Sequence, residues 1–449
     1  MTQGRRSSGE VVKRGLNLSA LRLATMSATV ALACGAAQAD FTSIVKTGVA
    51  VPGQGTSFTN VNIAGVDTVG GAAFVGSFTI GATNYSGLYH KVNNVISPLA
   101  DRGTLGPAGE TINSIIAAGD YENGVIVFAA NTSAGRTLYR YTPGTGLAAL
   151  VREGDVLPGS SSPVSTFYNR GVAGDANEFA FGTARSDAST ALFTSISGFP
   201  VVTADDKTRS PIAETGDFIN FPELHYRNGH TAFVGTGADP DWPGPGPAPV
   251  EPAGVFISSP GNPLEIVAGR NFEIPGGNGL RFREFERPRI MPDNRVAFAG
   301  GIIDEEDPEG ERHMGVFILN PDLTWKKYID SEMLLPGLHD GIAEFNQYSL
   351  ETDVNYFGVN DLSDGSYIYY ESAAGVFTKL VDSYETLDGK ALARIRMLGD
   401  TALNGGELYF RADFTDGTSG IYRTSVPEPA SLGIAMFAAA GVLARRRPR

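Results

Sequence analysis

Gly229-His230-Thr231-Ala232-Phe233 is one of seven similar short segments that recur along the chain. The other six are Gly71–Phe74, Gly124–Phe128, Asn177–Phe181, Asn294–Phe298, Val354–Phe357 and Gly406–Phe410. Their final aromatic residues are separated by 54, 53, 52, 65, 59 and 53 residues. A Gly or Asn that leads into alternating apolar and aromatic residues is typical of a strand that follows a turn. A repeat of this length, rich in strands, predicts a propeller-like array.

Each repeat is expected to hold four strands. A Pro-Gly turn such as Val51-Pro52-Gly53 precedes a first strand such as Phe58 to Ala64, and the recurring aromatic segment is the second strand. A third strand carries Gly87-Leu88-Tyr89, and a fourth carries Ile96 to Leu99. Three or four strands per period, each bounded by turn residues, indicate an all-β protein.

The two ends of the repeat region complement each other. The seventh third strand, at Tyr422, has no fourth strand after it, whereas Phe41–Gly48 resembles a fourth strand without a repeat before it. Pairing of these segments would close a ring and leave no open strand edge between the chain ends. We therefore predict one closed propeller of seven four-stranded blades; paired sandwich domains are the alternative fold.

The composition agrees with a turn-rich folded domain. The 449 residues include 56 Gly and 26 Pro, and 42% are hydrophobic while 19% are charged. Such an apolar content is sufficient for a core and excludes a disordered chain.

The N-terminus is typical of a secretory signal peptide. Basic residues up to Arg22 precede the apolar run Leu23–Cys34, and Ala37 and Ala39 form a small-residue cleavage site before Asp40. Residues 1–39 are therefore expected to direct the chain to the Sec translocon and to be removed by signal peptidase. The chain from Asp40 has no cysteine, which excludes disulfides and thiolate metal sites. Lipoprotein processing at Cys34 is the alternative.

The C-terminus has three consecutive parts. A box of Val426, Pro427, Glu428 and Pro429 precedes the apolar run Ala430–Ala444, and the basic residues Arg445, Arg446 and Arg447 follow. Residues 425–449 thus resemble the PEP-CTERM sorting signal of envelope-forming bacteria. The resemblance implies recognition by an exosortase, cleavage near the box and transfer to the outer surface. The apolar run would form a short transmembrane helix of roughly 22 Å; an ordinary tail anchor is the alternative.

The repeat domain, residues 40–424, is strongly acidic. The two terminal segments hold 9 of the 35 basic and 2 of the 49 acidic residues, which leaves 26 basic and 47 acidic residues and a net charge of −21. This charge argues against nucleic acid as a partner. The repeat also resembles a bacterial tandem-repeat family named for an Asn-x-x-Gly-x-x-Ala-Phe motif, through Ala73-Phe74, Ala232-Phe233 and Ala297-Phe298. That resemblance implies a surface-sorted β-rich protein and supplies no catalytic residues.

Two long loops between second and third strands are the candidate binding segments. The first carries Asp239, Asp241 and Trp242, and an exposed Trp242 could stack on a sugar ring. The alternative is a tryptophan packed over the blade edge.

The second loop carries Asp304, Glu305, Glu306 and Asp307. These oxygen ligands could bind calcium, but they lack the spacing of a defined calcium loop, so a solvated acidic loop is the alternative. No other metal or cofactor is expected.

A further candidate site is the channel. Arg281, Arg283, Arg287 and Arg289 interleave with Glu284 and Glu286 in a first strand that is expected to line it. Sites of this kind combine residues from several blades, so spacing along the chain does not reveal them.

The hypothesis for function is a non-enzymatic, envelope-sorted protein that serves as a structural or binding component of the cell surface or of an extracellular polysaccharide matrix. It is expected to be anchored transiently in the inner membrane before it reaches the surface. The first alternative is a secreted carbohydrate-active hydrolase or lyase with carboxylates at the channel mouth. The second is a calcium-stabilised adhesion module.

Overall fold

The computed structural model describes residues 40–66, 71–160, 162–174, 178–196, 198–212, 216–238, 250–259, 262–277, 279–303, 312–320, 322–350, 355–373, 375–397, 403–404 and 407–425. The chain divides into two units, Met1–Asp40 and Phe41–Arg449. All thirty described elements are strands and lie in the second unit, which is described here by itself.

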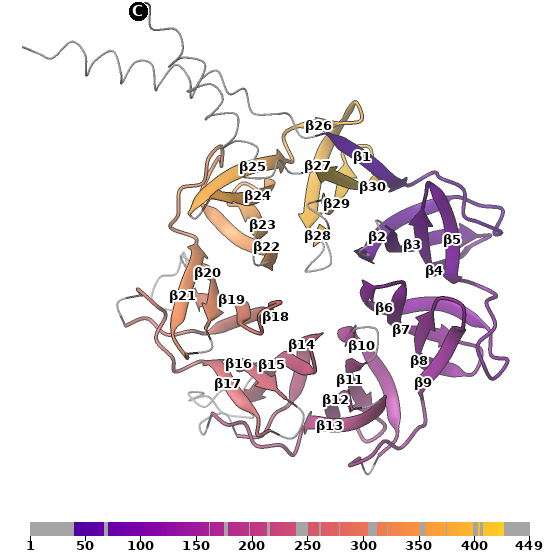
Figure 1. The fold of residues 1–449 in the computed structure, drawn as a ribbon, viewed down its shortest axis with the longest axis horizontal. Helices are drawn as coiled ribbons and strands as arrows, with labels where there is room; N and C mark the ends of the chain where they lie inside the picture. The colour runs from indigo at the N-terminus through magenta and orange to yellow at the C-terminus, as the bar shows by residue number, and fades with distance from the viewer. Residues whose placement is uncertain are drawn as a thin grey trace, which may run out of the picture. The chain divides into compact units, whose positions relative to one another are not determined.

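The second unit consists of seven antiparallel sheets arranged as the blades of a propeller (Figure 1). Blades 1 to 3 contain, in chain order, β2 (Phe58–Val66), β3 (Ala72–Ile80), β4 (Thr83–Val92) and β5 (Val95–Ala100); β6 (Ile112–Glu122), β7 (Val125–Thr132), β8 (Gly135–Thr142) and β9 (Gly146–Arg152); β10 (Val164–Gly174), β11 (Phe179–Arg185), β12 (Thr190–Ile196) and β13 (Phe199–Asp205).

Blades 4 to 6 contain β14 (Asn220–Arg227), β15 (His230–Ala238), β16 (Val250–Ser258) and β17 (Glu265–Gly269); β18 (Glu284–Ile290), β19 (Val296–Ile303), β20 (Arg312–Leu319) and β21 (Trp325–Asp330); β22 (Ile342–Leu350), β23 (Asn355–Asp361), β24 (Ser366–Ala373) and β25 (Val376–Asp382). Blade 7 contains β27 (Lys390–Met397), β29 (Glu407–Phe414), β30 (Ser419–Ser425) and β1 (Phe41–Lys46), with the short strands β26 (Thr386–Leu387) and β28 (Leu403–Asn404) at its edges.

The N-terminal strand closes the ring, as the sequence predicted. β1 pairs antiparallel with β30, and Phe41 lies opposite Thr424 while Lys46 lies opposite Gly420. Val45 of β1 is buried in a cluster that joins Tyr409 of blade 7 to Phe58 of blade 1. The first and last parts of the unit are therefore held in one blade (Figure 1).

A pair of aromatic residues recurs at the same place in all seven blades. The second and third strands place these residues opposite each other, as Phe74–Tyr89, Phe128–Tyr139, Phe181–Phe193, Phe233–Phe256, Phe298–Phe317, Phe357–Tyr369 and Phe410–Tyr422. Their ring centroids are 5.2–5.9 Å apart, within the range of favourable aromatic contacts. The repeated aromatics that define the sequence period are therefore cross-strand core pairs.

The core lies between the blades. Each of the seven buried hydrophobic clusters contains residues from two neighbouring blades, and together they cover all seven interfaces. Each blade thus buries both of its faces against neighbours.

Glycine precedes several of these aromatics by two residues, in places where a Cβ atom would collide with the ring or with a neighbouring backbone. A Cβ atom added at Gly254 of β16 would lie 2.2 Å from the carbonyl oxygen of Ala268. At Gly315 of β20 it would lie 2.9 Å from the Phe317 ring. Both distances are shorter than any normal carbon contact, so these strand positions require glycine.

The two faces of the ring are built from different connections. Because successive strands of a blade are antiparallel, the links between blades and the loops between second and third strands lie on one side, here called the connector face. The turns between first and second and between third and fourth strands lie on the other side, here called the turn face. Asn228-Gly229 on the turn face has φ values of 52° and 80°, which form the two-residue turn that leads into the repeated segment.

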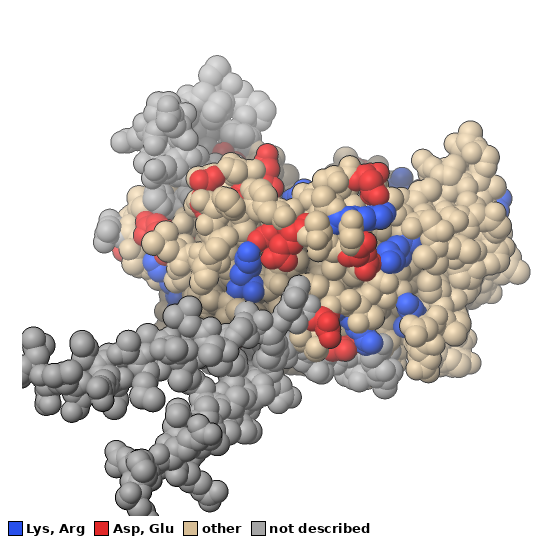
Figure 2. All heavy atoms as spheres, turned by 90° about the horizontal axis from the view of Figure 1, so that it is seen from above, with Lys and Arg blue, Asp and Glu red and all other residues tan. Residues whose placement is uncertain are grey.

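Links on the connector face share a hydrogen-bonded turn. Asp101 accepts a hydrogen bond from the Thr104 hydroxyl at 2.9 Å, and Asp205 accepts the same bond from Thr208 at 2.8 Å. Charged side chains of both signs lie side by side on the edge of the ring in Figure 2, and one part of that edge carries few charges. Ion pairs such as Lys46–Asp388, at 2.8 Å, keep single-sign patches small.

Candidate functional site

The central channel contains a cavity of about 550 Å³. All seven first strands contribute to its wall, namely β2, β6, β10, β14, β18, β22 and β27, which lie innermost in Figure 1. A cavity of this volume can hold a small molecule or one or two sugar units.

The wall of this cavity differs between the two halves of the ring. Blades 1 to 3 contribute small or uncharged residues: Asn62, Ile63, Ala64, Ala118, Gly119, Val172 and Ala173. Blades 4 to 7 contribute most of the polar groups, and their charged residues are Glu223, Arg287, Arg289, Glu344, Arg394 and Arg396. Among the described lining residues, four arginines therefore face two glutamates, although the repeat domain as a whole is acidic.

Arg287 is the most constrained residue of the charged half. Its φ of 53° lies in the left-handed region, at a bulge between Glu286 and Arg289 in β18. Its guanidinium donates to the Phe345 carbonyl and, at 3.2 Å, to Glu344. Such a backbone conformation is costly for a residue with a side chain and persists only where the surroundings enforce it.

The backbone of Arg287 is also bonded on both sides. Its N–H donates to Glu223 of blade 4, and its carbonyl accepts from the Tyr348 hydroxyl of blade 6. Arg287 in blade 5 thus joins three consecutive blades at the channel wall. The fixed guanidinium provides a preorganised cation beside the cavity.

Glutamates gather around this cation. Glu344 accepts from Asn360 at 3.1 Å, and Asn360 in turn donates to Asn346 at 3.0 Å. Burial raises the pKa of Glu286, Arg287 opposes this shift, and Glu223, Glu344 and Glu284 add to it. Glu286, which is next to Arg287 but not among the residues that line the cavity, is therefore easier to protonate than an ordinary glutamate.

His225 presents one defined ring nitrogen. The side chain is 2% exposed, and its Nδ1 accepts a hydrogen bond from the Ile290 N–H at 3.1 Å. Because Nδ1 acts as an acceptor, the neutral ring carries its proton on Nε2. His225 of β14 is thereby connected to β18 at the channel wall.

Blade 7 supplies positive charge that is only partly balanced. Asp413 pairs with Arg411 at 2.5 Å and with Arg396 at 3.6 Å. Within the described part of the chain, no carboxylate lies within ion-pair distance of Arg394. Burial and then the neighbouring Arg394 lower the pKa of Arg396, as expected where like charges crowd.

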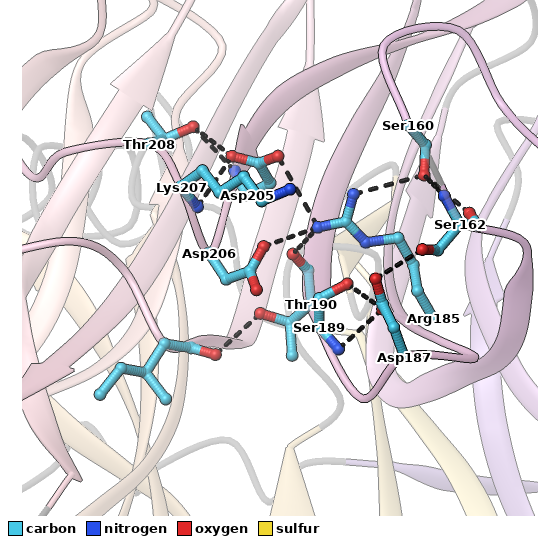
Figure 3. Close-up of polar contacts among 11 residues, drawn as sticks. Ser160, Ser162, Arg185, Asp187, Ser189, Thr190, Asp205, Asp206, Lys207 and Thr208 are labelled. Atoms are coloured by element: carbon cyan, nitrogen blue, oxygen red, sulfur yellow. Dashed lines mark hydrogen bonds and ion pairs between the residues drawn. The ribbon is translucent and has the colours of Figure 1, made fainter.

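A second charged cluster, on the connector face of blade 3, is connected by hydrogen bonds among its own residues (Figure 3). The guanidinium of Arg185, which is 3% exposed, donates to Asp206 at 2.7 Å and to Ser160 at 3.3 Å. The hydroxyls of Ser162 and Ser189 hold the pKa of Asp187 well below its ordinary value. These bonds fix the loops around the blade, and only Nε of Arg185 is buried without a hydrogen-bond partner among the described atoms of this cluster.

The sequence predictions for sites have mixed outcomes. Arg287 and Arg289 line the channel as expected. The binding candidates Asp239, Asp241 and Trp242, the acidic residues 304–307, the residues of the sorting motif, and Ala37 and Ala39 lie outside the described residues. Asp40 is exposed, next to the start of β1.

Sequence reasoning missed most of the channel wall. Glu223, Glu344, Arg394 and Arg396 come from blades 4, 6 and 7 and share no short motif. Their one common signal is their position in a first strand, several residues before the repeated aromatic segment.

Metal-ligand groups and membrane-spanning helices are both absent from the described residues. No group of three or more His, Cys, Asp or Glu side chains there could hold a metal ion. No described helix is long and apolar enough to cross a membrane. The expected C-terminal helix and the acidic residues 304–307 lie outside the described residues.

Family models match both the body and the tail of the chain. Residues 14–324 match a family of unknown function, DUF7453. The chain belongs to this family. In this DUF7453 chain the match ends within blade 5, before β21. No curated protein matches the sequence.

Residues 425–447 match the PEP-CTERM protein-sorting motif. The motif confirms the sequence prediction and marks the DUF7453 chain as an exported protein that is anchored through its C-terminus and then sorted to the surface. Because the motif is a recognition signal for exosortase processing, exosortase is a partner.

Several solved structures are similar to this chain at a low level. The tricorn protease gives a TM-score of 0.46 at 11% identity over 83% of this chain, and the DUF7453 chain covers 35% of it. The β-propeller domain of the Trilobed protease from Pyrococcus furiosus gives 0.47 at 9% identity, covering 82% of this chain and 95% of that one. The polysaccharide lyase Uly1 gives 0.45 at 9%, covering 79% and 88%. Similarity at this level says nothing about activity.

Proposed function

We propose that this protein is a non-enzymatic binding component of the bacterial envelope that holds an anionic group in its channel. A carboxylated or sulfated saccharide of the extracellular matrix is the ligand class we favour. The Sec translocon and signal peptidase are the partners proposed for its export. The proposal assigns no role to nucleic acid.

The observation that carries this proposal is the divided channel wall. Arg396 shares Asp413 with Arg411, and among the described residues no carboxylate lies within ion-pair distance of Arg394, so positive charge remains at the wall of an otherwise acidic protein. Arginine binds carboxylate and sulfate through paired, charge-assisted hydrogen bonds. The small residues of blades 1 to 3 leave room for the apolar face of a sugar ring opposite these cations.

The test is binding of acidic and neutral oligosaccharides to the ring, residues 40–425. We expect acidic oligosaccharides to bind. Added salt should weaken this binding, because the cations of the channel wall contribute to it through electrostatic attraction. The double substitution Arg394→Gln and Arg396→Gln should raise the dissociation constant at least about tenfold, since hydrogen bonds to charged groups contribute roughly 1.5–3 kcal/mol each.

The matched control is Lys326→Gln on the outer strand β21, which removes one exposed cation away from the channel. It should leave the dissociation constant unchanged. Equal binding of neutral and acidic chains, or equal losses in the control and the double variant, would contradict the proposal.

Cleavage of such a chain is a second candidate function, favoured by Glu286. Its raised pKa beside Glu223 and Glu344 resembles the separation of acid and base roles in carbohydrate-cleaving sites. Turnover of a bound acidic oligosaccharide that is lost in Glu286→Gln, with binding retained, would establish this function in place of the first. The calcium-stabilised adhesion module stays a prediction, and a chelator-dependent loss of thermal stability would support it.

A further inference from the structure

The sorting tail leaves the ring at a fixed place on the turn face. Ser425 ends β30, the third strand of blade 7, and Phe41 begins β1, the fourth strand. In the other six blades, these two strand ends are joined by a turn on the turn face. Since Phe41 lies opposite Thr424, the segment from residue 426 onward begins where blade 7 would have such a turn.

The segment between the ring and the apolar run is short. Only residues 426–429 separate β30 from the run that starts at Ala430. Four extended residues span at most roughly 14 Å. When the apolar run is in a bilayer, the turn face is therefore held within about this distance of the membrane surface.

The third-to-fourth-strand turns on this face are almost free of charge. Asp322 is the one Asp, Glu, Lys or Arg among the residues that join these strands in blades 1 to 6. By contrast, the links that lead into β6, β10, β14, β18 and β22 on the connector face each contain two or more charged residues. This distribution lowers the charge of the outer rim of the turn face, whereas the segments that join first to second strands on the same face hold seven acidic residues and one arginine.

Four of these turns also expose an apolar side chain at or next to the tip. Val95, Phe199, Leu323 and Val376 are 63%, 74%, 74% and 54% exposed. The connector face exposes apolar side chains as well, such as Leu334 at 96%, which lies in a link that also holds Glu332 and Asp340. The outer rim of the turn face thus combines apolar tips, few charges and the attachment point of the tail.

We propose that the turn face lies on the bilayer while the tail anchors the chain, with Phe199 and Leu323 in contact with lipid. The connector face is then directed away from the membrane. Each tip contributes little by itself, but a short tether keeps the local lipid concentration high. This inference rests on membrane anchoring of the tail and is independent of the channel ligand.

The experiment uses the complete exported chain, residues 40–449, inserted into phosphatidylcholine vesicles that contain a nitroxide-labelled lipid. Because this chain has no cysteine, Val95→Cys, Val376→Cys and Leu334→Cys each provide one labelling site for a fluorophore. The matched control is Leu334→Cys, an exposed apolar position on the connector face. We expect several-fold stronger quenching at positions 95 and 376 than at 334.

A second set of chains tests the contacts themselves. Phe199→Asp combined with Leu323→Asp should reduce the quenching at position 95, and a chain that ends at Ser425 should lose it. Comparable quenching at 95 and 334, or none at 95 on vesicles that carry the protein, would overturn the proposal. Vesicle flotation is the separate check on anchoring: a chain that fails to float with vesicles lacks the anchor, and the inference falls with it, whereas oligosaccharide binding is unaffected.

Discussion

At the scale of single residues, the blades depend on glycines that make room for the aromatic pairs. Gly254 and Gly315 both stand two residues before a third-strand phenylalanine, in places where a Cβ atom would collide with backbone or ring. Strand interiors normally disfavour glycine, so its recurrence here reflects packing rather than flexibility. The repeat period is therefore maintained by small residues as well as by large ones.

Gly254→Ala should destabilise the protein by about 1–3 kcal/mol, because the added methyl group displaces the backbone of β17. Gly358→Ala is the matched control, since it lies in β23 and its nearest neighbour would be 3.6 Å from the added atom. Urea unfolding measures both free energies of unfolding. Similar losses in the two variants would show that strand propensity, and not the contact, determines the effect.

Glu110 makes stability depend on pH at a single buried position. The carboxylate is 6% exposed and accepts hydrogen bonds from the Tyr139 hydroxyl at 2.6 Å and the Ala108 N–H at 2.9 Å. The hydrogen bond from Tyr139 lowers the pKa of Glu110, and Arg152 adds to the shift. A lowered folded-state pKa stabilises the protein above the ordinary pKa of glutamate, and this contribution is lost as the pH falls through the folded value.

Glu110→Gln should therefore cost about 1–2 kcal/mol at pH 7 and progressively less below about pH 4. The measurement is urea unfolding from pH 7 to pH 3, with the exposed Glu265→Gln as control. A difference between wild type and Glu110→Gln that stays constant across this range would contradict the assignment.

At the scale of elements, β1 is the strand on which closure depends. It covers β30, and its Val45 fills the interface between blades 7 and 1. Without β1, β30 would become an exposed edge that can pair with other chains. The expected signal-peptidase site at Ala39 leaves only Asp40 before this strand.

A chain that begins at Gly48 should lose at least about 3 kcal/mol of stability, through the lost ladder and the vacated position of Val45. It should also self-associate. Calorimetry and size-exclusion chromatography measure the two effects against the chain from Asp40. A synthetic peptide of residues 40–47, added in trans, should restore part of the melting temperature; an unchanged melting temperature in the shortened chain would show that β1 is dispensable.

At the scale of the whole molecule, sequence periodicity accounts for the ring but not for the channel. The aromatic pairs, the four strands of each repeat and the pairing of Phe41–Lys46 with the last blade follow from local patterns and are confirmed. Arg287 could be anticipated because charged residues alternate in one first strand. Its left-handed backbone and its bonds to Glu223 and Tyr348 could not, since they join residues about 60 positions apart.

The channel wall is less symmetric than the ring around it. Seven similar blades could present seven similar first strands, yet blades 1 to 3 contribute small residues and blades 4 to 7 contribute the charges. Packing between blades constrains the buried aromatics equally in every repeat, whereas residues that face the cavity are free to differ. The proposed binding of an anionic group depends on this asymmetry.

Both ends of the ring lie at the position of one missing turn, which makes the ring suitable for circular permutation. Phe41 and Ser425 lie where each of the other six blades has a connection between its third and fourth strands. A linker of two to five residues between them would therefore give a continuous backbone. Circular permutants opened at any other third-to-fourth-strand turn should then fold to the same ring. A sorting tail appended to such a permutant would move around the rim while remaining on the same side of the disc.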